Sequence, residues 1–178
     1  MMVGISIATK WEWQAVLEYF HKPAENCITY PYGKYFIETV NEVKLLFYST
    51  GVRKVNGVGA NQYMISQFSL KKVIVIGTCA GIDSQYQMLD IFVPSKAVQY
   101  DCTVKEIEPL IKESFIVDID LSSYQYHGYT GTIGTADKAV VMWKDYLELK
   151  ENNITIADTE SRCDCLHMQE KLRGMYHN

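Results

Sequence analysis

The sequence predicts an α/β protein of three layers, in which a mixed central β-sheet is covered by helices on both faces. Short apolar runs alternate along the chain with segments of helical spacing, which is the pattern of alternating strands and helices. Some runs are too rich in β-branched residues for strands with one face in water. Strands that alternate with helices form a parallel or mixed sheet with helices packed on its two sides.

The first part of the chain predicts three strands and two helices. Residues 3–8 are a short apolar run and predict a buried strand. Residues 9–20 follow at helical spacing. Residues 34–40 and 42–50 predict an antiparallel pair joined by a polar turn, and a glycine-opened loop leads into a helix within residues 51–70. The apolar face of the first helix carries Trp13, Val16, Leu17 and Phe20.

The middle of the chain predicts a further strand, a loop and an extended segment. Residues 71–77 are too β-branched for a half-exposed strand, so we expect both faces to be buried. Residues 78–84 form a loop at the carboxyl end of that strand. Residues 90–101 predict an extended segment that bends at Pro94.

The last part of the predicted domain returns to alternating elements. Residues 103–127 are irregular and rich in tyrosine, with a short helix at 106–114. Residues 128–137 predict a glycine-spaced strand that ends in an acidic turn. An amphipathic helix at 143–153 and a strand at 154–160 follow.

Composition excludes several classes of protein. A length of 178 residues favours one domain, and the net charge of -4 provides no basic surface for nucleic acid. The longest apolar stretch, residues 71–82, is too short to span a bilayer. The N-terminus lacks the basic region and cleavage site of a signal peptide, which predicts a cytoplasmic protein.

The cysteines predict neither disulfides nor a metal site. Their number is odd and they are scattered through a chain without an export signal, so we expect reduced thiols. The group of Cys163, Cys165, His167 and His177 fits no zinc-binding spacing. The five cysteines are Cys27, Cys79, Cys102, Cys163 and Cys165.

Polar motifs follow four predicted strands, where α/β proteins bind their ligands. They are "ATKWE", "STGVRKVNG", "GTCAG" and "ADTE", and "LDIFVPSKAVQYD" and "GTIGTADKAV" lie between the last two. This ordered set resembles the purine nucleosidase and phosphorylase superfamily, with the greatest likeness to the 5'-methylthioadenosine/S-adenosylhomocysteine nucleosidases. The resemblance covers residues 2–161 and implies one nucleosidase-like domain over residues 1–161.

The resemblance implies hydrolysis of the N-ribosidic bond of a 5'-substituted adenosine. It makes Glu12 the catalytic carboxylate that activates water, and Glu160 the group that holds the ribose hydroxyls. It implies no metal or organic cofactor, a small-molecule nucleoside as partner, and a homo-oligomer, commonly a dimer. The implied substrate-binding residues are Thr78, Cys79, Ala80, Gly81, Ala139, Val140, Thr159 and Glu160.

Each of these residues also has a purely structural interpretation. An acid in the first turn of a helix, as at Glu12, is favoured by the helix dipole alone. Cys79 suits a small buried filler better than a nucleophile. Arg53 stands where the family's loop has its second glycine. Its structural interpretation is an ion pair with an acid at the surface. Asp137 is a candidate cap as much as a site residue.

Water is favoured over phosphate as the nucleophile. Phosphorolysis needs a strong anion site, usually with arginines. The phosphorylase pattern places an arginine two residues before the glycine of "GTC", and this chain has Val75 there. A nucleoside phosphorylase and a nucleoside-binding protein without catalysis remain the alternatives.

The last segment, residues 162–178, departs from the family pattern. Permitted codons for "RCDCLHM" displaced by one nucleotide encode Ala-Ala-Ile-Ala-Tyr-Ile-Cys, which restores the family's small-residue helix after "ES". We therefore expect an out-of-frame tail, a fold incomplete at the C-terminus and impaired activity, because the family's aspartate that protonates the purine would be missing. The nucleotide sequence tests this hypothesis.

Overall fold

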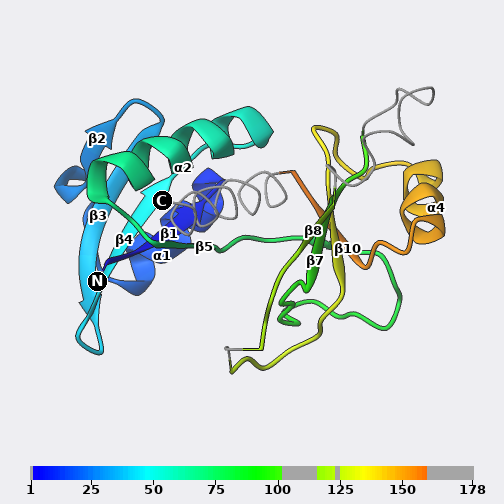
Figure 1. Cartoon of the computed structure of the whole chain (residues 1–178). Coiled ribbons are helices and arrows are strands. Elements are labelled where there is room, and N and C mark those ends of the chain that lie inside the picture. The colour runs from blue at the N-terminus through cyan, green and yellow to red at the C-terminus, as the bar shows by residue number, and fades with distance from the viewer. Residues whose placement is uncertain (1, 102–115, 123–124, 160–178) are drawn as a thin grey trace, which may run out of the picture. The chain divides into compact units, whose positions relative to one another are not determined.

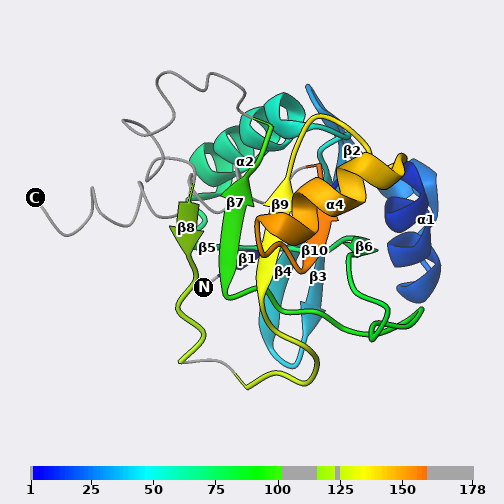
Figure 2. The same ribbon diagram turned by 90° about the vertical axis from the view of Figure 1, so that its right-hand side faces the viewer.

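The computed structural model describes residues 2–101, 116–122 and 125–159. These residues form two compact units, divided in the sequence between Thr78 and Cys79, and each is described by itself. The first unit contains a sheet of strand order β2-β3-β4-β1-β5, and the second a sheet of order β6-β10-β9-β7-β8 (Figures 1 and 2). The predicted mixed α/β class is confirmed, and the strands are divided between two sheets.

The first unit follows the predicted order of elements. The antiparallel pair β3–β4 is confirmed, and its turn residues Asn41 and Glu42 both have positive φ, of 48° and 66°. Such a turn matches the twist of a two-residue hairpin. The sequence patterns missed η1 and β2. The elements are β1 (Met2–Ile7), α1 (Lys10–Tyr19), η1 (Ala24–Asn26), β2 (Ile28–Tyr30), β3 (Gly33–Val40), β4 (Val43–Ser49), α2 (Lys54–Phe68) and β5 (Lys72–Val75).

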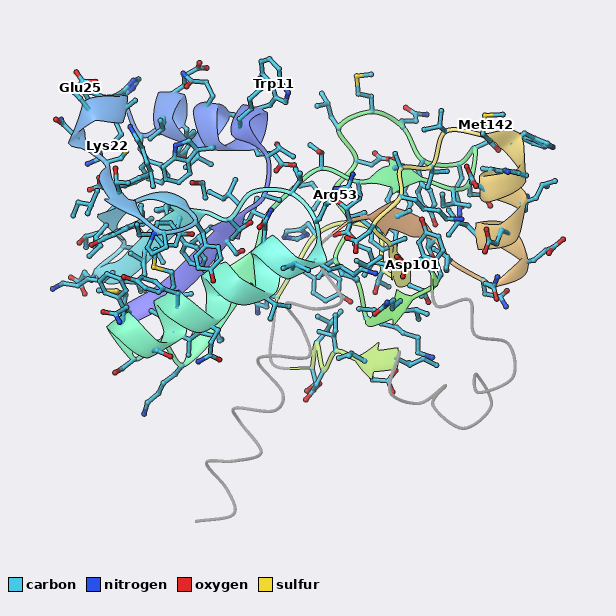
Figure 3. The ribbon with its side chains drawn as sticks, turned by 90° about the horizontal axis from the view of Figure 1, so that it is seen from above. Trp11, Lys22, Glu25, Arg53, Asp101 and Met142 are labelled. Carbon is cyan, nitrogen blue, oxygen red and sulfur yellow. The ribbon has the colours of Figure 1, made fainter. Side chains whose placement is uncertain are left out.

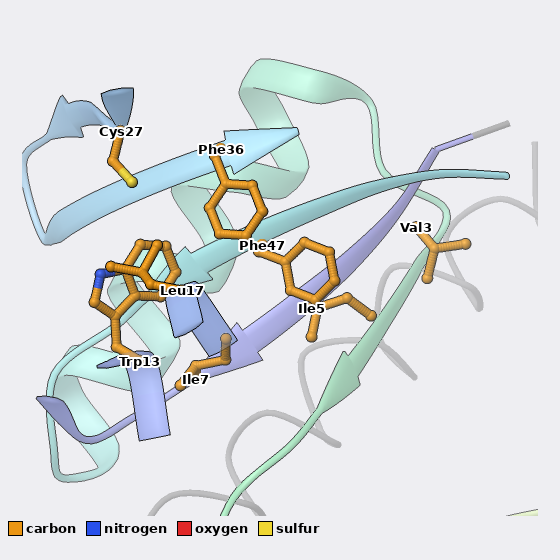
Figure 4. Close-up of a cluster of buried hydrophobic side chains, with 8 residues drawn as sticks. All are labelled: Val3, Ile5, Ile7, Trp13, Leu17, Cys27, Phe36 and Phe47. Atoms are coloured by element: carbon orange, nitrogen blue, oxygen red, sulfur yellow. The ribbon is translucent and has the colours of Figure 1, made fainter. Parts of the chain in front are cut away.

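Helices α1 and α2 cover opposite faces of the first sheet, as the three-layer prediction requires. Side chains alternate between the two faces of a strand, so Phe47 of β4 packs with α1 while its neighbours Leu46 and Tyr48 pack with α2. Figure 4 shows the α1 side, where Trp13 and Leu17 meet the strands. The predicted apolar face of α1 is therefore confirmed.

A buried polar pair fixes α2 against the sheet. The Tyr48 hydroxyl donates a hydrogen bond of 2.5 Å to Oδ1 of Asn61, and both side chains are buried. A buried hydroxyl or amide is costly unless it is hydrogen-bonded. This bond joins α2 to β4 and favours their observed register.

Strand β5 differs from its prediction. Val73 is buried on the α2 side, but Ile74 is 45% exposed, so burial of both faces is wrong for this residue. The reason is that β5 is an edge strand of its sheet, paired with β1 alone among the described residues. An apolar run does not distinguish an edge strand from a central one.

The second unit is a mixed sheet with one described helix. Strand β9 lies between β7 and β10 and is parallel to both. Figure 2 shows α4 beside the strands of this sheet. Leu149 of α4 packs with Ile154 and Ala157. The elements are β6 (Ala80–Gly81), β7 (Lys96–Gln99), β8 (Ile116–Asp118), β9 (Thr132–Thr135), α4 (Trp143–Glu151) and β10 (Ile156–Asp158).

Some predictions in this half are not met or lie outside the described residues. Strand β8 falls in a segment predicted to be irregular, and its three residues are too few to show an alternating pattern. The helix predicted at 106–114 and the tail of residues 162–178 lie outside the described residues. Among the described residues, no helix has the length and apolar character needed to cross a bilayer.

Arg53, labelled in Figure 3, precedes α2 with φ 80° and ψ 156°. This region of backbone space is almost restricted to glycine and costs other residues about 1–3 kcal/mol. We expect Arg53→Gly to raise the free energy of unfolding by about 1 kcal/mol, because relief of strain exceeds the added entropy of the unfolded chain. Urea denaturation measures the change.

A neighbouring substitution provides the control. Lys54 is the first residue of α2, so Lys54→Gly should lower the free energy of unfolding by up to about 1 kcal/mol, as glycine does within helices. If both substitutions lower stability equally, Arg53 is not strained.

Candidate active site

The carboxyl ends of three parallel strands meet at one edge of the first unit's sheet. Strands β4 and β5 both pair in parallel with β1. The segments that follow them therefore begin at the same edge. The Thr50 N–H donates to the Ile7 carbonyl at 2.8 Å, which ties the loop after β4 to the end of β1. Three of the four predicted strand-end motifs begin here.

Helix α1 starts at this edge with a reciprocal cap. The Glu12 N–H donates to Oγ1 of Thr9 at 3.2 Å, and the Thr9 N–H donates to Oε2 of Glu12 at 2.9 Å. This is a capping box, which satisfies two N–H groups that the helix leaves without partners. The Thr-x-x-Glu spacing of residues 9–12 carries the signal for it, and the sequence interpretation missed the role of Thr9.

The Glu12 carboxylate also reaches the segment after β5, 66 residues away. Its Oε1 accepts hydrogen bonds from the Thr78 N–H at 2.6 Å and the Thr78 hydroxyl at 2.8 Å. Gly77 allows this approach, because a Cβ there would lie 3.3 Å from Oε1. Two of the predicted site residues, Glu12 and Thr78, are thus brought together.

These contacts set the charge of Glu12. Partial burial by itself raises the pKa of the carboxyl, but hydrogen bonds from the Thr78 and Thr9 backbones and from both threonine side chains outweigh it. The pKa of Glu12 therefore lies below its usual value, since each bond stabilises the ionised form. Glu12 is a carboxylate at neutral pH.

The second unit gathers the other predicted binding residues that are described. Ala80 and Gly81 of β6 pair with Ala157 and Ile156 of β10. Burial of the Cys79 sulfur and the neighbouring Asp158 carboxylate raise the pKa of its thiol, although the residue is exposed. A thiol that stays protonated is a poor nucleophile. The prediction of Cys79 as a small buried filler is wrong, because the residue is exposed.

The segment after β9 lies at the carboxyl edge of the same sheet. Because β9 and β10 are parallel, the segments with Ala139 and Val140 and with Thr159 begin at one edge. The Thr135 hydroxyl donates to Asp158 at 2.6 Å, which links the two strand ends.

Both interpretations of Asp137, as a cap and as a site residue, stay open. Its N–H donates to Asp101, labelled in Figure 3, at 2.8 Å.

Comparisons with known proteins identify the family of the chain. The sequence profile described as "Phosphorylase superfamily" matches residues 3–142. The chain belongs to this superfamily. No curated protein sequence matches it.

Several solved structures share the fold of this chain at low sequence identity. The 5'-methylthioadenosine/S-adenosylhomocysteine nucleosidase of Helicobacter pylori, with butyl-thio-DADMe-Immucillin-A, has a TM-score of 0.82 and 17% identity over 96% of this chain and 80% of that one. The futalosine hydrolase of the same organism gives 0.82 and 17% over 96% and 79%. The S-adenosylhomocysteine nucleosidase of Streptococcus pyogenes gives 0.77 and 16% over 96% and 78%.

Glu160 lies outside the described residues, so its predicted role in this superfamily site stays a prediction. The predicted convergence of Glu12, the Thr78–Gly81 segment and Glu160 on one cleft likewise stays a prediction. Within the described part of the chain, no three His, Cys, Asp or Glu side chains gather as metal ligands.

The low pKa of Glu12 predicts how stability depends on pH. The folded-state pKa lies below the ordinary value of 4.5, so the stabilisation by the ionised form is fully present above that value and is lost as pH falls through the folded-state pKa. We expect the stability difference between the native chain and Glu12→Gln to be constant near neutral pH and to shrink below pH 4.5. Thermal unfolding across a pH series measures it.

The difference between the two proteins isolates Glu12 from the other acids. Glu38, Asp120 and Asp145 also have lowered pKa values, but their contributions are common to both proteins and cancel. A stability difference that grew on acidification would contradict the hydrogen bonding described for Glu12.

Proposed function

We propose that this chain is a purine nucleosidase that hydrolyses the N-ribosidic bond of 5'-substituted adenosines, with Glu12 as the group that orients the attacking water. The contact between Glu12 and Thr78 carries this proposal. It fixes an ionised carboxylate at the carboxyl edge of the parallel strands, where α/β folds bind ligands.

The hydrogen bonds to Glu12 indicate where the water binds. A carboxylate accepts about four hydrogen bonds, two at each oxygen. Among the described residues, Oε1 takes two bonds from Thr78 and Oε2 takes one from Thr9. The remaining capacity is on Oε2, which we propose as the acceptor for the water. The low pKa makes Glu12 a weak base, so it serves by orienting the water and by stabilising the positive charge on the sugar.

The reaction balances as a simple hydrolysis. The water oxygen bonds to the anomeric carbon, and the bond to the purine nitrogen breaks with its electron pair going to the purine. Glu12 orients the water but does not keep its proton: one proton of the water stays on the new sugar hydroxyl, and the other is transferred through solvent to the purine nitrogen. Protonation of a leaving group typically contributes about 10²–10⁴-fold to the rate.

The remaining predicted residues complete the proposed site. We propose that Thr78, Cys79, Ala80 and Gly81 face the ribose, Thr159 and Glu160 its hydroxyls, and Ala139 and Val140 the base. The solved relatives include proteins named for methylthioadenosine, S-adenosylhomocysteine and futalosine, which makes these three nucleosides the first substrates to test. We also propose that the chain forms a homodimer and acts in the cytoplasm.

Water is proposed as the nucleophile because Arg53 is the one arginine of residues 1–161. The test is release of adenine from methylthioadenosine by the purified chain, with and without inorganic phosphate. We expect release at equal rates in both, with free methylthioribose as product. Release that requires phosphate and gives methylthioribose 1-phosphate would make the chain a phosphorylase. Binding of the nucleoside without release would make it a non-catalytic binding protein.

A further inference from the structure

The hydroxyl of Tyr100 is buried and makes no hydrogen bond within the described structure. A buried hydroxyl without a partner destabilises the folded state, and such groups are rare in native proteins. Burial raises the pKa of this hydroxyl, so it is a neutral group able both to donate and to accept a hydrogen bond.

The ring of Tyr100 lies against the strand that precedes the proposed base-binding segment. Its backbone N–H donates to the Thr135 carbonyl at 3.3 Å, which places Tyr100 beside the end of β9. Gly134 leaves room for the ring, because a Cβ on Gly134 would lie 3.0 Å from Cδ1 of Tyr100. The ring packs against the same buried cluster as Val140.

Charged groups hold Lys138 over this ring. The Lys138 ammonium lies 5.5 Å from the ring centroid and pairs with Glu148 at 3.0 Å and with Asp145 at 3.6 Å. Lys138 thus joins the segment of residues 137–140 to α4 across the face of Tyr100.

We propose that Tyr100 is a positioning residue for the purine base. Its ring supports the segment of residues 137–140, and its hydroxyl gains a hydrogen bond to the backbone of that segment when a base binds there. This inference rests on the proposed function, because Ala139 and Val140 are the residues proposed to face the base. It adds a role for Tyr100, which lies in the motif "LDIFVPSKAVQYD" but was assigned no role there.

The experiment uses Tyr100→Phe, which removes the hydroxyl and keeps the ring. Free adenine is the probe, because it contains the base and cannot be cleaved at a ribosidic bond. By calorimetric titration we expect Tyr100→Phe to bind adenine about tenfold more weakly, which corresponds to about 1.4 kcal/mol. Its Tm without ligand should be equal to or above that of the native chain, because no hydrogen bond is lost in the free state.

Two further measurements separate positioning from a purely structural role. Tyr146→Phe is the matched control, since Tyr146 packs against the same cluster, and its affinity for adenine should be unchanged. With methylthioadenosine, Tyr100→Phe should raise KM and leave kcat within about twofold, as expected for a group that acts on binding alone.

Each result decides the inference. Equal adenine affinity of Tyr100→Phe and the native chain, or no adenine binding by either, overturns it. A Tm that falls together with affinity also overturns it, because the hydroxyl would then have a structural role. Cleavage of methylthioadenosine by the native chain decides the proposed function separately.

Discussion

Glu12→Gln is expected to lower the rate of adenine release from methylthioadenosine by about 10²–10³-fold, the size typical for loss of one electrostatic group in an active site. Glutamine has nearly the shape of glutamate, but it carries no charge and its amide nitrogen cannot accept hydrogen bonds. The substitution therefore removes both the orientation of the water and the negative charge near the developing cation of the sugar. Single-turnover assays with enzyme in excess over labelled nucleoside measure the loss even where the starting rate is low.

Glu18→Gln is the control for this experiment. Glu18 lies on the same helix and is exposed, and its side chain accepts a hydrogen bond from Gln14, so the rate of adenine release should stay within about twofold. Circular dichroism at the assay temperature establishes that both variants are folded. Adenine release by Glu12→Gln at the native rate would remove Glu12 from the mechanism.

The second large effect concerns the helix that carries Glu12. Leu17 is 3% exposed and lies in the cluster that joins α1 to the sheet (Figure 4). We expect Leu17→Ala to lower the free energy of unfolding by about 2–5 kcal/mol, through lost burial and the cavity left behind. Equilibrium unfolding in urea, followed by tryptophan fluorescence, measures this loss.

An exposed apolar position provides the comparison for Leu17. Val55 of α2 is 80% exposed, so Val55→Ala should change the free energy of unfolding by no more than about 0.5 kcal/mol. Equal effects of the two substitutions would mean that α1 is not held by this cluster.

Much of the fold could be predicted from the spacing of apolar residues. Trp13 and Leu17 mark one face of α1, and the structure buries both. The spacing of apolar residues failed where burial depends on the position of a strand in the sheet or where a strand is very short. Ile74 is apolar but lies on an edge strand, and β8 is too short for its pattern to differ from that of a loop.

The site could be predicted only as separate segments. The resemblance indicated Glu12 and Thr78 through different motifs, and nothing in the spacing of residues shows that they share a hydrogen bond across 66 positions. The role proposed for Tyr100 could not be predicted from the sequence. Whether a buried hydroxyl has a hydrogen-bond partner depends on packing, which the residues of its motif do not reveal.

The capping box of α1 affects how position 12 should be interpreted in related sequences. Glu12 completes the start of its helix through Thr9 whether or not any nucleoside is cleaved. A descendant that had lost catalysis would still be under selection to keep this glutamate, because its replacement weakens the helix. A glutamate at this position is therefore poor proof of activity. The Thr78 hydroxyl, which takes no part in the cap, would be freer to drift once catalysis was lost, and so a hydroxyl at position 78 is the more informative sign of a working enzyme.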